Sequence, residues 1–118
     1  MSKVYSFHMI SLKAGARGPD FERYIHGVLE SWTKLGGLSG MTMRLLKGDR
    51  GDREGKYLVM FEFDSVERRN QLFPEAGPAA RQGSAEFMQW MGAQGPALAK
   101  WDEYATPIDV IYTDYREV

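Results

Sequence analysis

Two histidines are the side chains in this 118-residue sequence best suited to proton transfer near neutral pH. His8 lies in an alternating segment, Val4 to Lys13, on the same face as Ser6 and Ile10. An imidazole that opens from such a strand into an apolar pocket could act as a general base. The alternative is a strand histidine that hydrogen-bonds a neighbour and has no further role. His26 lies beside the apolar stripe of a helix, which indicates a solvated position.

Glu62 is a carboxylate in the most apolar segment of the chain, between Phe61 and Phe63. Ionisation there is costly unless a cation lies nearby. Arg44 lies on the preceding strand of a predicted hairpin, in a register that permits a diagonal pair, so we predict a structural Glu62–Arg44 pair. An unpaired Glu62 would instead have a raised pKa and become a candidate proton acceptor. Arg44 is also a candidate ligand-binding residue.

Three aromatic residues are further candidates for ligand binding: Tyr57, Trp90 and Trp101. Their ring N–H or O–H groups could orient a ligand oxygen, although aromatic residues often only fill a core. The composition agrees with either role, because three Trp, six Tyr, six Phe and seven Met provide a large polarizable contact surface. Such a surface suits a pocket or a subunit interface.

Several classes of site are disfavoured by what the sequence lacks. There is no Cys, which excludes disulfides, thiolate metal sites and cysteine nucleophiles. No His-x-x-x-His or Glu-x-x-His spacing is present to begin a metal site, so we expect neither a metal nor a cofactor. Without a Gly-x-Ser-x-Gly elbow, a serine hydrolase is also disfavoured.

The charge balance and the N-terminal sequence bear on partners and compartment. The net charge is −1 and the basic residues form no stripe, so nucleic acid is not an expected partner. The first residues alternate apolar with polar side chains and resemble neither a signal peptide nor a membrane span. Together with the absence of Cys, this predicts a cytoplasmic protein that does not associate with membranes.

The spacing of apolar residues predicts the elements that must position these side chains. One long helix is indicated by a stripe at spacings of three and four, made of Phe21, Tyr24, Ile25, Val28, Leu29, Trp32 and Leu35. It follows Pro19 and Asp20 and ends at Gly36-Gly37. The other predictions are strands over Val4–Lys13, Met41–Lys47, Lys56–Asp64 and Tyr104–Tyr115, and helical segments over Val66–Phe73 and Ala79–Met91.

This order predicts an α+β fold in a single domain covering residues 1–118. Read as β-α-β-β-α-β, it is the ferredoxin-like arrangement, in which both helical regions cover one face of a four-stranded antiparallel sheet. Several strands carry apolar residues on both faces, and we place Phe61 on the uncovered face. That face is therefore expected to pack against a second copy of the chain in a homodimer.

The layout resembles the dimeric α/β-barrel superfamily over nearly the whole chain. The similarity rests on the long Phe21–Leu35 helix, the Lys56–Asp64 strand running into Asp64-Ser65-Val66-Glu67, and the aromatic last strand. Within the superfamily it is most similar to the antibiotic-biosynthesis monooxygenase-like and stress-responsive A/B barrel groups. The resemblance implies small subunits that pair sheet to sheet and hold a pocket for an apolar or aromatic ligand.

The sequence departs from two functional motifs of that superfamily. Polyketide-cyclase-like members carry His-Pro-x-His after the third strand and its short helix, where this chain reads Phe73-Pro74-Glu75-Ala76. The proline matches and both histidines are missing, so chemistry that depends on the motif is not carried over. The Asn, Trp and His set of the haem-degrading members is not recoverable either.

Two hypotheses for function remain open from the sequence. In the first, the protein is a cofactor-independent oxygenase or cyclase that acts on a small aromatic or polyketide-like compound, an activity implied by fold-level analogy. In the second, it is a non-catalytic ligand-binding or structural dimer whose pocket is filled by its own Met and aromatic side chains. The missing motif histidines favour the second, and the position of His8 favours the first.

Overall fold

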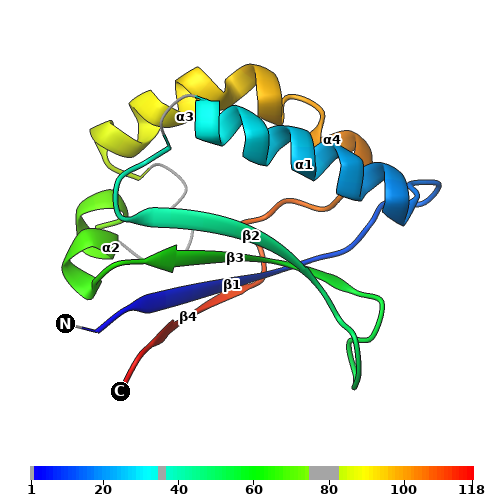
Figure 1. The fold of residues 1–118 in the computed structure, drawn as a ribbon, viewed down its shortest axis with the longest axis horizontal. Coiled ribbons are helices and arrows are strands. Elements are labelled where there is room, and N and C mark those ends of the chain that lie inside the picture. Colours follow the sequence, from blue (N-terminus) through cyan, green and yellow to red (C-terminus); the bar gives the residue numbers. More distant parts are fainter. Residues whose placement is uncertain (1, 35–36, 75–82) are drawn as a thin grey trace.

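The computed structural model describes residues 2–34, 37–74 and 83–118 and contains an antiparallel sheet with helices on one face (Figure 1). The strands are β1 (Val4–Ile10), β2 (Met41–Lys47), β3 (Tyr57–Phe63) and β4 (Tyr112–Arg116), in the order β2-β3-β1-β4. Helices α1 (Gly18–Lys34) and α3 (Ala85–Leu98) lie across the sheet, and α2 (Val66–Leu72) lies at one end. The predicted ferredoxin-like α+β class is confirmed.

The pairing of the strands decides which side chains face the helices. Ser6 is paired with Phe61 on β3 and with Asp114 on β4, while His8 is paired with Val59 and Tyr112. Successive side chains of a strand point to opposite faces, so these residues all share the helix-facing side, here called the inner face. The opposite outer face carries Tyr5, Phe7, Met9, Leu58, Met60 and Tyr115.

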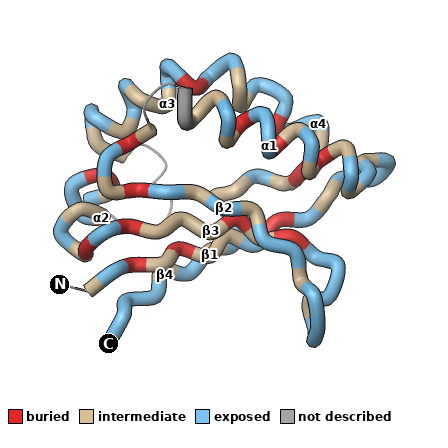
Figure 2. Tube along the Cα trace, in the orientation of Figure 1, coloured by how far each residue is buried: buried red, intermediate tan, exposed pale blue. Residues whose placement is uncertain are grey.

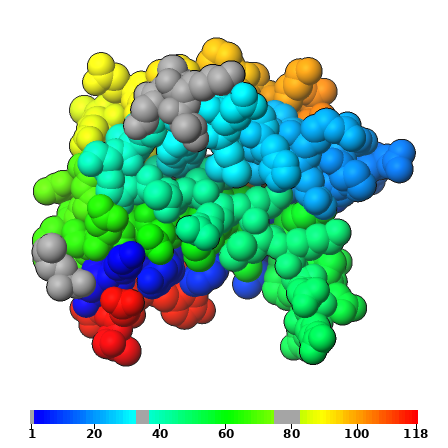
Figure 3. Space-filling model, viewed as in Figure 1, coloured from blue at the N-terminus to red at the C-terminus, as the bar shows by residue number. Residues whose placement is uncertain are grey.

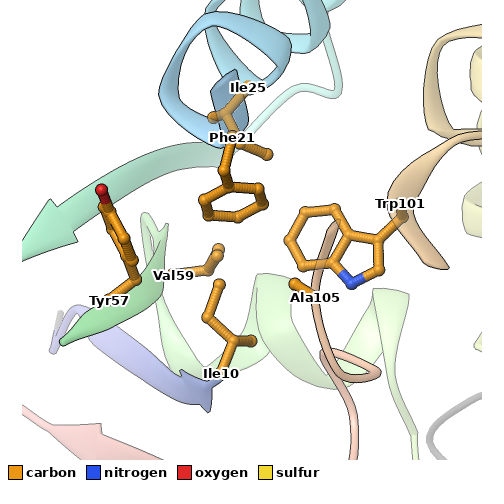
Figure 4. Close-up of a cluster of buried hydrophobic side chains, with 7 residues drawn as sticks. All are labelled: Ile10, Phe21, Ile25, Tyr57, Val59, Trp101 and Ala105. Carbon is orange, nitrogen blue, oxygen red and sulfur yellow. The ribbon is translucent and has the colours of Figure 1, made fainter. Parts of the chain in front are cut away.

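Two clusters of buried side chains pack the helices onto the sheet. One surrounds Phe21 and joins α1 to the sheet and to Trp101 of the short helix α4 (Trp101–Tyr104), as Figure 4 shows. The other lies toward α2 and consists of Val4, Leu38, Met41, Phe63 and Leu72. Figure 2 shows that the buried positions of the sheet lie mainly along β1 and β3, whereas β4 has none. Ser6, His8 and Phe61 lie between the clusters along β1 and β3.

The predicted boundaries hold best in the first half of the chain. The strand Met41–Lys47 is confirmed at both ends, and the strand Lys56–Asp64 is one residue shorter at each end. Helix α1 agrees with the predicted stripe, of which Leu35 lies outside the described residues. Gly37 has a φ of 63° and donates its N–H to the Trp32 carbonyl (2.9 Å), as expected of a glycine that ends a helix.

The second half of the chain differs from the prediction. The helical segment expected over Ala79–Met91 begins at Ala85 and continues to Leu98, through Pro96; residues 79–82 lie outside the described residues. The strand expected from Tyr104 begins only at Tyr112. Tyr104 belongs instead to α4. In the connection that follows, Ala105 forms an isolated bridge with Leu12, and residues 108–111 form a turn and a bend. That connection brings Ile108 and Asp109 to the inner face.

Phe61 was placed on the wrong face by the sequence prediction. Its register with Ser6 puts it on the inner face, and its ring contacts His8 at 5.1 Å between centroids. The outer face is formed by the alternate residues of β3, Leu58, Met60 and Glu62. In a nearly continuous apolar run the alternation that assigns faces is absent, so sequence alone gave no basis for the choice.

The loop of the β2–β3 hairpin projects away from the helices (Figures 1 and 3). It and the C-terminal strand lie at opposite ends of the outer sheet face. No helix among the described residues is both long enough and apolar enough to cross a bilayer.

Candidate active site in a cavity between sheet and helices

A cavity of about 760 Å³ lies between the inner face of the sheet and the helices. This volume is within the range of pockets that bind small organic molecules. The floor comes from β1, β2, β3 and β4, and the roof from α1 and α3. The lining is mainly aromatic and Met side chains: Trp32, Met41, Met43, Phe61, Phe63, Phe73, Phe87, Trp90, Met91, Trp101 and Tyr112. A pocket filled by its own side chains, as the second hypothesis required, is therefore not what the structure contains.

His8 is held in the floor of this cavity by hydrogen bonds to both ring nitrogens. Its Nδ1 lies 2.6 Å from the carbonyl oxygen of Ile108, and its Nε2 lies 2.7 Å from the hydroxyl oxygen of Ser6. A carbonyl oxygen only accepts hydrogen bonds, so Nδ1 carries the proton in the neutral ring. Nε2 is then an acceptor, and the Ser6 hydroxyl donates to it. The backbone at Ile108 thus selects the tautomer that leaves Nε2 basic.

The surroundings of His8 favour its neutral form at physiological pH. Burial lowers the pKa of the imidazole below its usual value, and the Ile108 carbonyl and the charges of Asp114 and Asp109 only partly oppose this effect. The ring stacks on Tyr112 (5.1 Å, 13°) and meets Phe61 edge to face. These contacts fix the plane of the imidazole, so its basic nitrogen has a defined direction.

An ion pair borders the cavity beside His8. Arg69 of α2 donates from its guanidinium to the carboxylate of Asp114 on β4, and both side chains are partly buried. Both residues line the cavity. The pair joins α2 to the edge strand, and it keeps a carboxylate close enough to influence the His8 pKa. Among the described residues, no group of three or more His, Asp or Glu side chains is arranged to hold a metal ion.

The roof of the cavity contains polar atoms without hydrogen-bond partners among the described residues. They are Nε1 of Trp90 and both amide atoms of Gln94, all buried. Gln94 is only 1% exposed, although it carries two donors and an acceptor. Trp90 and Gln94 are four residues apart on α3, which places them on one side of the helix. Both line the cavity.

The candidate residues from the sequence fall into two groups in the structure. His8, Trp90 and Trp101 line one cavity. The Trp101 indole N–H is already used, because it donates to the Thr106 carbonyl (2.9 Å). Tyr57 lies instead in the core around Phe21 and does not line the cavity (Figure 4).

The Tyr57 hydroxyl donates to the Glu22 carboxylate. Burial, followed by this hydrogen bond and the Glu22 charge, raises the pKa of Tyr57 to about 12. Tyr57 therefore remains a protonated, structural side chain at neutral pH.

Glu62 and Arg44 both belong to the outer face, away from the cavity. Glu62 is paired with Tyr5 and Thr42 across the two neighbouring strands. Its carboxylate forms an ion pair with Lys3 (3.5 Å), so the predicted partner, Arg44, was wrong. Since β3 lies between β1 and β2, Glu62 has neighbours on both strands. A partner for Glu62 was predicted only on β2, the other strand of the hairpin. Glu62 is partly exposed and lies beyond reach of the His8 cavity.

Sequence analysis missed Gln94, Arg69 and Asp114 as cavity residues. Gln94 carries a usable signal, because it follows Phe87 by seven residues and Trp90 by four, a core position of the helix. The predicted helix stopped at Met91, and the signal was lost with its last turns. Arg69 and Asp114 are 45 positions apart in the sequence and meet only in the folded chain, so no local pattern encodes their ion pair.

Comparison with known proteins gives likeness in fold only. No protein-family model matches the sequence, and no curated protein matches it. A dimeric protein of unknown function with a ferredoxin-like fold from Bacteroides fragilis superposes with a TM-score of 0.53 at 14% identity, covering 98% of this chain and 96% of that one. A dabb family protein with a ferredoxin-like fold from Mesorhizobium loti gives a TM-score of 0.50 at 9% identity, covering 100% and 97%. The resemblance drawn from the sequence is thus confirmed for the fold.

Proposed function

We propose that the protein binds a small aromatic or polyketide-like compound in the cavity and removes a proton from it without a cofactor. The observation that carries this proposal is the chain of hydrogen bonds from Ser6 through His8 to the Ile108 carbonyl. It holds an uncharged imidazole with its basic nitrogen in the floor of an aromatic cavity. A strand histidine with a purely structural role would not need an open cavity beside it.

The reaction step follows from the chemistry of the ring. His8 Nε2 accepts a proton from a phenol, or from a carbon next to a ketone, and leaves a phenolate or an enolate. The Ser6 hydroxyl donates a hydrogen bond to Nε2 in the free protein. It either relays the substrate proton to Nε2 or rotates away from it when the substrate binds. Asp114 and Asp109 favour the protonated imidazole that forms, since their charges raise its pKa.

The same intermediate leads to either activity in the first hypothesis. In a cyclase, the carbanion adds to a carbonyl of the same molecule. In a cofactor-independent oxygenase, it gives an electron to O₂, which is then a co-substrate. The proposal commits to the shared first step, removal of the proton by His8.

The proposal includes assembly of the chain, as one domain, into a cytoplasmic homodimer through the outer sheet face. Helices cover the inner face, and the outer face carries Tyr5, Phe7, Met9, Leu58, Met60 and Tyr115. Met9 is 36% exposed and Tyr115 is 57% exposed. A sheet surface that is largely apolar, with Arg44 and Glu62 as its charged members on β2 and β3, is typical of an interface between subunits. A second copy would bury it and leave each cavity within its own subunit.

Exchange of a carbon-bound proton tests the catalytic step directly. We expect the wild-type protein to accelerate exchange of deuterium into the position next to the ketone of 2-tetralone in deuterated water, followed by proton NMR. His8→Ala should lower the exchange rate by about 100-fold or more, since a positioned base contributes that much. His26→Ala, which changes the exposed histidine of α1, is the matched control and should retain the rate.

Three outcomes separate the hypotheses. Exchange that depends on His8 supports the proton-transfer function. Binding of the ketone without accelerated exchange, detected by a rise in Tm, would contradict catalysis and support a ligand-binding dimer. Equal exchange with wild-type protein and His8→Ala would show that His8 is not the base.

A further inference from the structure

The roof of the cavity offers hydrogen bonds that the described part of the protein does not use. Gln94 is almost completely buried, and both atoms of its amide lack a protein partner. Buried polar groups in folded proteins are nearly always hydrogen-bonded. One amide with both of its atoms unpaired, beside an open cavity, therefore points to a ligand that supplies the missing partners.

Trp90 extends the same polar site. Its indole ring is held against Trp32, with 4.3 Å between ring centroids, and tilted against Phe87 at 6.1 Å. Aromatic neighbours on two sides restrict the ring, so its buried N–H cannot simply turn to solvent. Because Trp90 and Gln94 are one helical turn apart, their unpaired atoms lie on the same side of α3. Both residues line the cavity, opposite the floor that holds His8.

The donor and acceptor pattern defines the matching group. The Gln94 amide presents an N–H donor beside a carbonyl acceptor, and Trp90 adds a second kind of donor and no acceptor. The complementary group carries an acceptor next to a donor. Neither side chain is charged and the polar atoms of both are buried, which disfavours a formal charge on the bound group. The aromatic side chains beside them, Phe87 and Trp32, suit a flat ring that carries this group.

We infer that Gln94 and Trp90 form the recognition site for a neutral carbonyl with an adjacent N–H or O–H group on an aromatic ligand, as in a carboxamide or a lactam. This inference rests on the proposed function and adds to it the polar edge of the substrate. It also assigns an orientation, with the polar edge toward α3 and another part of the ligand toward His8. Trp90 and Gln94 are thereby specificity residues, and His8 is the catalytic one.

Two ligands of equal shape test this assignment. 1-Naphthamide carries the adjacent carbonyl and N–H groups, whereas 1-isopropylnaphthalene has the same outline and no polar atom. We expect the wild-type protein to bind the amide about tenfold or more tightly than the hydrocarbon, measured by calorimetry or by the rise in Tm. Gln94→Leu should abolish this preference and bind the hydrocarbon at least as well as the wild type does.

Controls and outcomes distinguish this inference from the proposed function. Gln89→Leu changes an exposed glutamine of the same helix and should keep the preference. Trp90→Phe keeps a smaller aromatic ring, removes the N–H and should weaken binding of the amide more than binding of the hydrocarbon. It provides a second test if Gln94→Leu fails to fold. Equal binding of both ligands to the wild type would overturn the inference and leave the cavity as an aromatic binding site. Binding of neither ligand would also overturn the inference, whereas the exchange of 2-tetralone tests the proposed function independently.

Discussion

His8 shows how a backbone carbonyl can prepare a side chain for chemistry. The Ile108 carbonyl fixes the proton on Nδ1, while burial in an aromatic cavity keeps the ring uncharged. The sequence indicated His8 because it shares a strand face with Ser6. It could not indicate Ile108, which is one hundred positions away. Ile108 approaches because the chain after α4 hydrogen-bonds to the end of β1 and the residues that follow it, through Thr106 with Ser11 and Ile111 with Met9.

The lowered pKa of His8 predicts a pH dependence of stability. The unfolded chain binds a proton near the usual value of 6.5, and the folded protein binds it only at lower pH. Above about pH 7 the His8 ring is neutral in both the folded and the unfolded state, so it does not change the free energy of unfolding. As the pH falls below 6.5, the unfolded state gains the proton first, and the free energy of unfolding decreases. Urea unfolding from about pH 7 to 5 measures this loss. The free energy of unfolding of His8→Gln should decrease less over this pH range than that of the wild type. Identical pH profiles for the two proteins would contradict a lowered pKa of His8.

Tyr57→Phe separates the core from the cavity. The substitution removes the hydroxyl that donates to Glu22 and leaves the ring packed on Phe21, so the free energy of unfolding should decrease. Affinity for an aromatic probe such as 1-naphthamide should remain within about twofold, since Tyr57 does not line the cavity. A large loss of affinity in a protein of normal stability would restore the ligand-binding role that the sequence suggested.

At the scale of elements, α3 determines the shape of the cavity and was the helix least predictable from sequence. Its apolar residues are concentrated in the first half, and Gly92, Gly95 and Pro96 weaken the pattern in the second. The helix is fixed at its start by Ser84, whose side chain accepts from the Phe87 N–H, and by Glu86, which pairs with Arg68 of α2 (2.6 Å). Tertiary contacts thus support a segment with weak intrinsic preference.

Gly83, just before α3, and Gly92, within it, should respond in opposite directions to substitution by alanine. Gly83 has a φ of 58°, and an added Cβ would lie 2.6 Å from the Phe87 ring, so Gly83→Ala should destabilise the protein. The cost is about 1 kcal/mol or more, because the left-handed conformation is strained for alanine. Gly92 lies within α3 with no atom near its added Cβ, and Gly92→Ala should stabilise the protein by about 0.5–1 kcal/mol. Thermal unfolding measures both; changes of the same sign would contradict this description of α3.

At the scale of the whole molecule, the sheet separates two functions. Its inner face forms the floor of the cavity, and its outer face is free for a second copy. The element order predicted the fold and an uncovered face correctly. It did not assign the two faces of β3 correctly. The run from Tyr57 to Phe63 is apolar at nearly every position, and a shift of one residue exchanges the faces.

Phe7→Glu tests the outer face as a dimer interface. The neighbours of Phe7 across the sheet are Met60 and Thr113, so a carboxylate there would have no cation directly opposite. It should be too costly to bury between two sheets, and the variant should sediment as a monomer with its secondary structure retained. Met88→Glu is the control, because Met88 is 48% exposed on α3 and lies on the helical side. A wild-type protein that sediments as a monomer at micromolar concentration would contradict the dimer.

Nitrogen NMR of the His8 ring tests the central claim most directly, and the chain contains only one other histidine, His26, as an internal reference. At about pH 7 we predict a neutral His8 ring with the proton on Nδ1, and a shift of the Nε2 resonance when 2-tetralone binds. His26 lies on the exposed side of α1 and should not respond to the ketone. A proton on Nε2 of His8, or an unchanged His8 spectrum in the ketone-bound protein, would contradict its role as the base.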